Sequence, residues 1–240
     1  MRAGRFIAGT AIVLLAGSQA YGQQVEQRPT MNIGQWYGGL EAGIIIPDDL
    51  SYSLSGPVNG VSTTISGNIS FDTGSAVGAF VGYHFNDYFS GEGEFLYGNF
   101  DFDKLTANFT GALVGSGTES VNGSVDTETF LANGIITPFG RSEFTPYIGG
   151  SIGFANHDSN ISSITGPNGT ASVNSSDSGV DFAAGAIAGI DWAATDQWSL
   201  GARYRFLWVN LKLECPSGTT CSNGDLTAHV FTLNATYHFE

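Results

Sequence analysis

Five charged residues fall on the polar faces of otherwise apolar, alternating segments: Glu41, Glu92, Glu94, Arg203 and Arg205. Carboxylates and guanidinium groups so placed can form ion pairs, and two carboxylates can also act as general acid and base. On a strand, Glu92 and Glu94 would share a face and lie roughly 7 Å apart along the chain. An inverting glycosidase has its carboxyl pair at a similar separation. Nothing else in the sequence indicates an open substrate cleft, so ion pairing is the favoured interpretation.

The other residue types that catalyse reactions or bind metals form no recognisable motif. The four histidines are widely spaced and match no HExxH or other metal-ligand pattern: His84, His157, His229 and His238. No Ser-His-Asp arrangement can be read from the chain. The sequence therefore predicts no catalytic residues, no metal site and no cofactor, and we expect the protein not to be an enzyme.

Cys215 and Cys221 are the only cysteines in the chain. Pro216 and Gly218 lie between them, which suits a turn that brings the two Cα atoms within about 7 Å. In an oxidising compartment such a pair tends to form a disulfide. Two thiols are too few ligands for a metal site, and the spacing differs from that of a redox Cys-x-x-Cys motif. A disulfide is therefore predicted, with two free thiols as the alternative.

Segments in which apolar and polar residues alternate would form the strands that position these side chains. This alternation recurs in eight segments, each close to the ~9–11 residues that a tilted membrane strand needs. The segments are residues 36–44, 76–85, 89–97, 127–139, 146–154, 181–192, 198–208 and 231–239. Their apolar faces carry almost no charge, whereas the polar faces hold the five charged residues. This pattern indicates strands with one face toward lipid and the other toward a polar lumen.

The connections between the segments alternate strictly between short and long. The short ones are residues 86–87, 140–144 and 193–197, and the long ones are residues 47–70, 98–126, 155–180 and 210–228. An up-and-down barrel whose N-terminus starts inside has this order of short periplasmic turns and long external loops. The long connections are rich in Ser, Thr, Gly and Asn, and we expect solvated loops there, with residues 155–180 flexible. The sequence thus predicts an all-β, eight-stranded antiparallel transmembrane β-barrel.

The composition excludes several other classes of protein. Charged residues make up 12% of the chain, about half the roughly 25% of soluble domains, and aromatic residues also reach 12%. No apolar run is as long as the about 20 residues of a membrane helix. The chain has 22 acidic residues against eight Lys and Arg, a balance that argues against binding to nucleic acid.

The N-terminus has the features of a secretory signal peptide in the required order. Arg2 and Arg5 precede an apolar stretch at residues 6–17, and Ala20-Tyr21-Gly22 forms a small-x-small cleavage site. Cleavage after Gly22 would leave six basic residues against 22 acidic ones, a net charge of −16. The expected organisation is a signal peptide, a periplasmic segment and a barrel domain, at residues 1–22, 23–34 and 35–240.

The last segment resembles the C-terminal assembly signal of bacterial outer-membrane barrels, because every second residue is apolar or aromatic: Phe231, Leu233, Ala235, Tyr237 and Phe239. With four further motifs, residues 35–240 resemble the small opacity/OmpA-type outer-membrane β-barrel family. Those motifs are Gly82-Tyr83-His84-Phe85-Asn86-Asp87, Glu92-Gly93-Glu94-Phe95, Ala132-Asn133-Gly134 and Pro146-Tyr147-Ile148-Gly149-Gly150. The family usually ends on the aromatic residue, whereas Glu240 follows Phe239 in this chain.

The resemblance implies a place in the outer membrane, contact with its lipid and assembly by the barrel assembly machinery through the C-terminal strand. Family members are surface antigens, adhesins, membrane-tethering proteins or narrow channels. We therefore expect a structural surface protein, favoured as a monomer, whose loops contact a host or surface ligand. The alternatives are a narrow porin-like channel gated by lumenal Glu and Arg pairs and, more distantly, an outer-membrane lipid-modifying enzyme.

The inward charges should pair in a barrel of this size. The lumen of eight strands is narrow enough for side chains to fill it, and unpaired charge in so confined a space is costly. The favoured role of the five charged residues is a structural plug, and the alternative is a gate whose switching opens a small pore.

Overall fold

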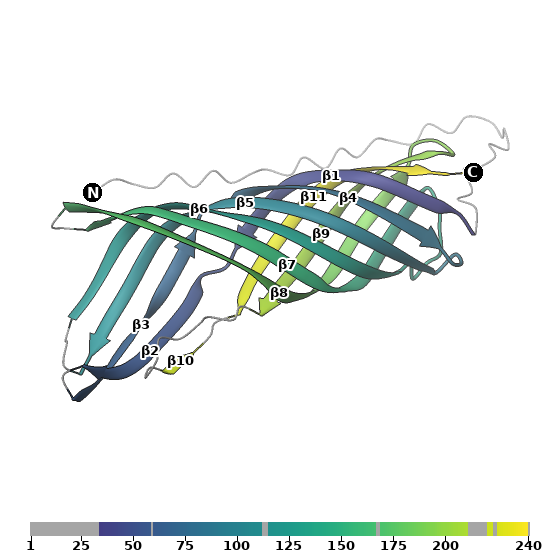
Figure 1. The fold of residues 1–240 in the computed structure, drawn as a ribbon. Coiled ribbons are helices and arrows are strands. Elements are labelled where there is room, and N and C mark those ends of the chain that lie inside the picture. Colours follow the sequence, from purple (N-terminus) through teal and green to yellow (C-terminus); the bar gives the residue numbers. More distant parts are fainter. Residues whose placement is uncertain are drawn as a thin grey trace, which may run out of the picture.

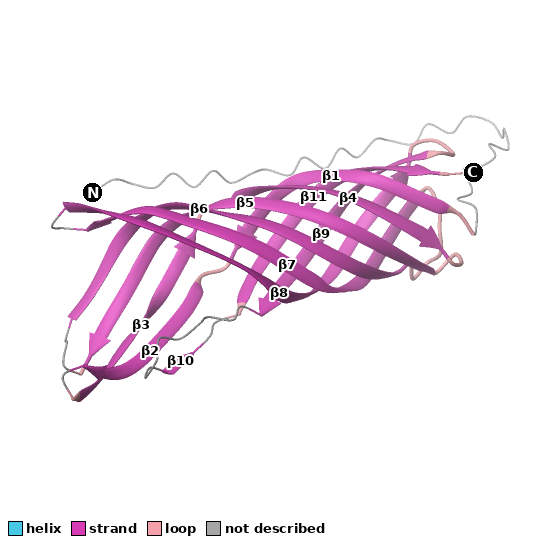
Figure 2. Ribbon diagram, viewed as in Figure 1, coloured by secondary structure: helices cyan, strands magenta, loops and turns pink. Residues whose placement is uncertain are grey.

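The computed structural model of the chain describes residues 34–58, 60–111, 115–166, 169–210, 220–222 and 225–239. These residues form β1 (Trp36–Pro47), β2 (Leu50–Val58), β3 (Val61–Phe71), β4 (Gly74–His84), β5 (Phe89–Thr110), β6 (Gly115–Ile136), β7 (Phe144–Gly166), β8 (Gly169–Ala193), β9 (Trp198–Asn210), β10 (Thr220–Ser222) and β11 (Leu226–His238). Figure 2 shows that short loops and turns make up the rest of the described chain. Within the described residues no helix is long and apolar enough to cross a membrane.

Eight of the strands close into a ring in which all neighbours are antiparallel. The order around the ring is β1, β4, β5, β6, β7, β8, β9 and β11, and the pairing of β11 with β1 closes it. Because every ring strand has a partner on both sides, its backbone groups are satisfied without water. The predicted eight-stranded barrel is confirmed, and Figure 1 shows its strands tilted around a common axis.

The outer surface of the ring is apolar, whereas its inner surface holds the buried polar and charged side chains together with separate apolar clusters. Leu40 and Leu233 are 69% and 71% exposed, whereas their chain neighbours Glu41 and Asn234 are buried inside the barrel. Large apolar side chains exposed in this number fit a surface that lipid solvates. The alternation in the sequence therefore assigned the lipid-facing and lumenal sides of these strands correctly.

Aromatic side chains gather at the end of the ring that holds the short turns. The exposed members of this group include Trp36, Phe85, Phe89, Trp192, Trp198 and Phe239. Neighbouring rings touch edge to face, as the indole of Trp198 does with the ring of Tyr237 at 5.1 Å between centroids. Such a girdle marks the boundary between lipid and water.

Local hydrogen bonds close the short turns. In the turn between β4 and β5, the side-chain oxygen of Asn86 accepts hydrogen bonds from the backbone N–H groups of Tyr88 and Phe89, at 2.8 and 2.9 Å. The hydroxyl of Thr195 accepts a bond from the backbone N–H of Trp198 at 3.0 Å in the turn before β9. Asn and Thr side chains stabilise tight turns in this way.

The long connections predicted as loops are instead mostly β-hairpins. β5 and β6 continue their pairing from the barrel wall to Phe109 opposite Gly115, and β7 and β8 pair as far as Gly166 opposite Gly169. Residues 155–180, expected to be flexible, therefore lie in two paired strands apart from residues 167 and 168, which are not described. Backbone pairing that starts in the barrel wall can extend outward without apolar side chains. The polar composition of this region therefore did not indicate a flexible loop.

One further hairpin widens the sheet beyond the membrane. β2 and β3 lie between β1 and β4 in sequence, and β3 pairs with β5 past the point where β4 has separated from it. β10 adds a short pairing to the free edge of β2. β5 to β8 and the β2–β3 hairpin extend well past the barrel on its long-loop side, as Figure 1 shows.

Candidate functional site

The structure brings the five predicted lumenal charges together in the middle of the barrel. Glu41 comes from β1, Glu92 and Glu94 from β5, and Arg203 and Arg205 from β9. All five side chains are at most 3% exposed. β5 and β9 are four strands apart in either direction around the ring of eight, so these arginines reach across the lumen to the two glutamates of β5.

Arg203 is the centre of this charged cluster. Its Nη1 lies 2.8 Å from Oε1 of Glu92, 3.4 Å from Oε2 of Glu94 and 3.8 Å from Oε2 of Glu41. Arg205 contacts an oxygen of Glu94 and lies 3.6 Å from Oε1 of Glu41. The two guanidinium groups thus share Glu41 and Glu94, whereas Glu92 pairs with Arg203, and three acids face two bases. Shared partners restrict each side chain more than an isolated pair would.

Neutral side chains complete the hydrogen bonding of the glutamates. Asn133 donates to Oε1 of Glu92 at 3.0 Å and to Oε2 of Glu94 at 2.7 Å. Thr232 donates to Oε2 of Glu41 at 2.9 Å. Buried carboxylates need such donors because the lumen offers them little water. Asn133 and Thr232 belong to the alternating segments 127–139 and 231–239, but the sequence alone did not connect them to the charged cluster.

Two tyrosines flank the charged cluster and lie over glycines of the neighbouring strands. The hydroxyl of Tyr37 donates to Oε2 of Glu92 at 3.3 Å, and the hydroxyl of Tyr147 accepts a bond from Nε of Arg203 at 3.1 Å. A Cβ on Gly82 would lie 2.2 Å from the ring of Tyr37, and one on Gly189 would lie 2.4 Å from the ring of Tyr147. These glycines give the rings room in the lumen.

Below the charged cluster, on the side of the short turns, the lumen is narrow and polar. A cavity of about 40 Å³ remains there. Nδ1 of His84 lies 3.0 Å from the hydroxyl of Ser90, which also accepts a hydrogen bond from Arg141 at 2.7 Å. Nε2 of His238 lies 3.1 Å from the hydroxyl of Ser199. Two of the four histidines thus form hydrogen bonds inside the barrel.

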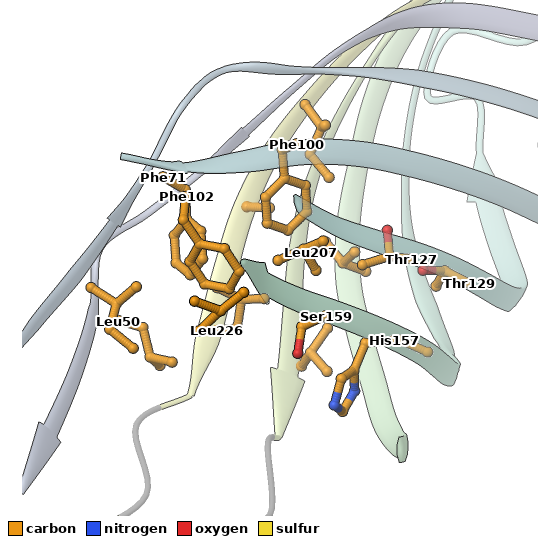
Figure 3. A pocket seen from close by; sticks show the side chains of 17 residues that line it. Leu50, Phe71, Phe100, Phe102, Thr127, Thr129, His157, Ser159, Leu207 and Leu226 are labelled. Atoms are coloured by element: carbon orange, nitrogen blue, oxygen red, sulfur yellow. The ribbon is translucent and has the colours of Figure 1, made fainter. Parts of the chain in front are cut away.

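Above the charged cluster, on the side of the long hairpins, the lumen opens into an apolar cavity of about 260 Å³. Figure 3 shows Phe71, Phe100, Phe102, Leu207 and Leu226 gathered around this space, with hydroxyl groups and an imidazole confined to part of the wall. The sequence did not reveal this cavity, because most of its lining comes from segments beyond the predicted strands. Its apolar character contrasts with the charged cluster beneath it.

The predicted assembly signal lies in β11 except for Phe239, which directly follows the strand, and its outward face is toward lipid. Phe231 and Leu233 are exposed, while the intervening Thr232 and Asn234 are buried in the lumen. β11 pairs along its length with β9 and β1. The part that these residues play in assembly stays a prediction.

Several sequence predictions fall outside the described residues. Cys215 is among these, as is the side chain of Cys221, so the disulfide stays a prediction. The same applies to the signal peptide at residues 1–22 and to nearly all of the periplasmic segment that follows it. In the part of the chain that the structure describes, His, Cys, Asp and Glu side chains form no group of three or more that could hold a metal ion.

A family model described as the outer membrane protein beta-barrel domain matches residues 9–239. The chain belongs to this family. It is therefore a protein of the outer membrane, in which the ring of eight strands contacts lipid. The resemblance read from the sequence motifs is confirmed. No curated protein sequence matches the chain significantly.

Among solved structures, the chain matches several outer-membrane and surface proteins at low sequence identity. Neisserial surface protein A is 16% identical, with 85% of this chain and 97% of that chain covered and a TM-score of 0.45. OprG from Pseudomonas aeruginosa is also 16% identical, with 89% and 100% covered and a TM-score of 0.45. Ail from Yersinia pestis is 13% identical, with 87% and 100% covered and a TM-score of 0.41.

Proposed function

We propose that this outer-membrane barrel is a structural surface protein that presents its long hairpins outside the cell and keeps its lumen closed. The observation that carries the proposal is the charged cluster, in which Arg203 and Arg205 reach across the barrel to the glutamates of β5 and also lie close to Glu41 on β1. The cluster acts as a plug between the two lumenal cavities. A barrel closed in this way has its accessible surface in the hairpins.

The hairpins offer an extended and acidic surface. β5 to β8 carry acidic side chains beyond the predicted membrane strands: Asp101, Asp103, Glu119, Asp126 and Asp158. Lys104 is the one lysine or arginine in the described parts of the hairpins, and it pairs with Asp103. A surface of this charge favours cationic partners over anionic ones. We infer that a host or surface ligand binding these hairpins would be basic, or bridged by divalent cations.

The protein reaches the outer membrane by export and assembly. The signal peptide directs export and is cleaved after Gly22, and β11 recruits the barrel assembly machinery. The protein then acts as a monomer without a catalytic site or cofactor. The outward apolar face of β11, from Phe231 to Tyr237, supports the assembly role because it is continuous with the lipid-facing surface.

Site-specific labelling of intact cells tests the presentation of the hairpins. With both native cysteines replaced by serine, Thr118→Cys places a thiol in β6 outside the membrane, and Asp196→Cys places one in the turn before β9. A membrane-impermeant maleimide should label the first variant in intact cells and the second only after the outer membrane is permeabilised. The reverse pattern would overturn the proposed orientation.

A second candidate function is a narrow channel gated by the same charged cluster. The observation in its favour is that cavities of about 40 and 260 Å³ lie on opposite sides of the cluster, so movement of the Arg203 and Arg205 side chains could join them. A plug would block ion flow through the lumen, whereas a gate would let ions pass each time it opens.

A further inference from the structure

We propose that the apolar cavity in the outer half of the lumen, between the charged cluster and the hairpins, is a binding site for a small neutral apolar molecule. This inference goes beyond the structural role proposed above. It does not depend on whether the charged cluster opens, since the cavity lies on the outer side of that cluster in either case.

The lining of the cavity is unusually apolar for the interior of a membrane barrel. Thirteen of its seventeen lining residues are Ala, Val, Ile, Leu or Phe, and the others are Thr127, Thr129, His157 and Ser159. Barrel interiors are generally polar because they are filled with water or hydrogen-bonded side chains. Water in this cavity would find few partners, so an apolar molecule would replace it favourably.

The apolar lining comes from separate strands that converge on one space. Ile45 on β1, Phe100 on β5, Val125 on β6 and Val230 on β11 belong to one buried cluster, and all but Val230 line the cavity. Ala155 on β7 and Leu207 on β9 belong to a second cluster on its other side. Each wall is therefore held by a hydrogen-bonded strand of the barrel, and the site is preformed.

The volume of the cavity limits the size of the ligand. A cavity of about 150 Å³ lined by Leu, Ile and Phe is large enough to bind benzene. In proportion, the 260 Å³ of this cavity would hold roughly ten non-hydrogen atoms. Molecules of that size include naphthalene, adamantane derivatives and hydrocarbon chains of eight to ten carbons.

The charges near the cavity select a neutral ligand over an anionic one. None of the described lining residues is Lys or Arg. The imidazole of His157 is the one nitrogen-bearing side chain of the lining, and its Nδ1 lies 3.3 Å from the carboxylate of the buried Asp181. A carboxylate or sulfonate on the ligand would meet no fixed cation and would approach this aspartate. The chemistry of the site therefore favours hydrocarbons over fatty-acid anions.

Photolabelling of the refolded full-length protein in lipid nanodiscs tests the site. The probe is adamantyl diazirine, and labelled residues are mapped by mass spectrometry with and without excess naphthalene. We expect labelling of cavity residues such as Phe100, Leu207 and Leu226 to fall at least tenfold when naphthalene competes. Labelling of lipid-facing residues such as Leu233 should be unchanged, because partition into lipid does not saturate. Naphthalene-1-sulfonate should not compete.

Substitutions on the two faces of β11 provide matched variants. Ala228→Phe fills the cavity and should lower labelling of its lining at least tenfold, whereas Ala235→Phe faces lipid and should leave it unchanged. If Ala228→Phe does not fold, Phe102→Ala enlarges the cavity and should make anthracene a better competitor than naphthalene. The proposed site would be overturned if cavity residues and lipid-facing residues were labelled equally and naphthalene did not compete at either. Equal competition by the sulfonate would overturn the selection for neutral ligands.

Discussion

Arg203 binds both carboxylate oxygens of Glu92 from the opposite wall of the barrel, with Nη1 2.8 Å from Oε1 and Nη2 3.1 Å from Oε2. This two-bond geometry is the strongest arrangement of an arginine and a carboxylate. The residues are 111 positions apart in sequence and lie on strands half-way around the ring from each other. The pair therefore spans the lumen, and we regard it as the centre of the plug.

Replacement of Arg203 by alanine should destabilise the barrel strongly. The substitution leaves Glu92 buried without its charged partner, and breaking one side of a buried ion pair costs about 3–5 kcal/mol. Urea unfolding of the protein refolded into lipid vesicles measures the loss. The double variant Glu92→Gln/Arg203→Gln is the control, because it removes both charges and should recover part of the stability. Equal stability of R203A and the unmodified protein would show that the pair contributes nothing.

Gly82 should tolerate no side chain of appreciable size. A Cβ at this position would overlap the ring of Tyr37, so Gly82→Leu should cost about 1–3 kcal/mol through overpacking. The matched control is Gly134→Ala, which adds a methyl group where no atom lies within 4 Å. Its effect should stay within about 0.5 kcal/mol. Unfolding midpoints in the same vesicles measure both changes, and similar losses for the two variants would contradict the packing argument.

The closed ring should make the folded protein resistant to detergent. Every strand of the ring is paired on both sides, so unfolding must break many backbone hydrogen bonds in an apolar medium. On a denaturing gel, the unheated protein should migrate differently from the boiled protein. Identical migration, together with a helical circular dichroism spectrum, would contradict the fold.

Cys215 and Cys221 should be joined by a disulfide in the exported protein. Export places the two thiols in an oxidising compartment, and the closed loop is short, so its stabilisation should be at most about 2–3 kcal/mol. Mass spectrometry of the protein alkylated without reduction tests the bond directly. The expected result is no alkyl adduct before reduction and two after it. Two adducts on the unreduced protein would refute the prediction.

The ring of strands and its lumenal charges could be predicted from the sequence for a simple physical reason. A membrane strand must alternate, so Glu92 and Arg203 could be assigned to the lumen from their apolar neighbours alone. In an up-and-down barrel the strands follow one another around the ring in sequence order, so the third and seventh of eight strands lie on opposite sides of the lumen. The individual hydrogen-bond partners of the lumenal charges were harder to predict. Asn133 donates to Glu92 and Glu94 because of strand register and tilt, which the sequence does not show.

The region outside the membrane could not be predicted in the same way. Alternation fades where both faces of a strand contact water, so the outer parts of β5 to β8 looked like loops. The apolar cavity went undetected for a related reason. Phe71, Phe102 and Leu226 lie outside the predicted strands, and only their pairing in the extended sheet brings them together.

Single-channel recording of the unmodified protein in a planar lipid bilayer tests the closed lumen most directly. Glu41, Glu92, Glu94, Arg203 and Arg205 fill the cross-section with side chains that are at most 3% exposed. A lumen closed in this way should give a flat baseline without stable openings at moderate voltage and near-neutral pH. Stable, reproducible openings of the unmodified protein under these conditions would contradict the plug and establish the channel instead.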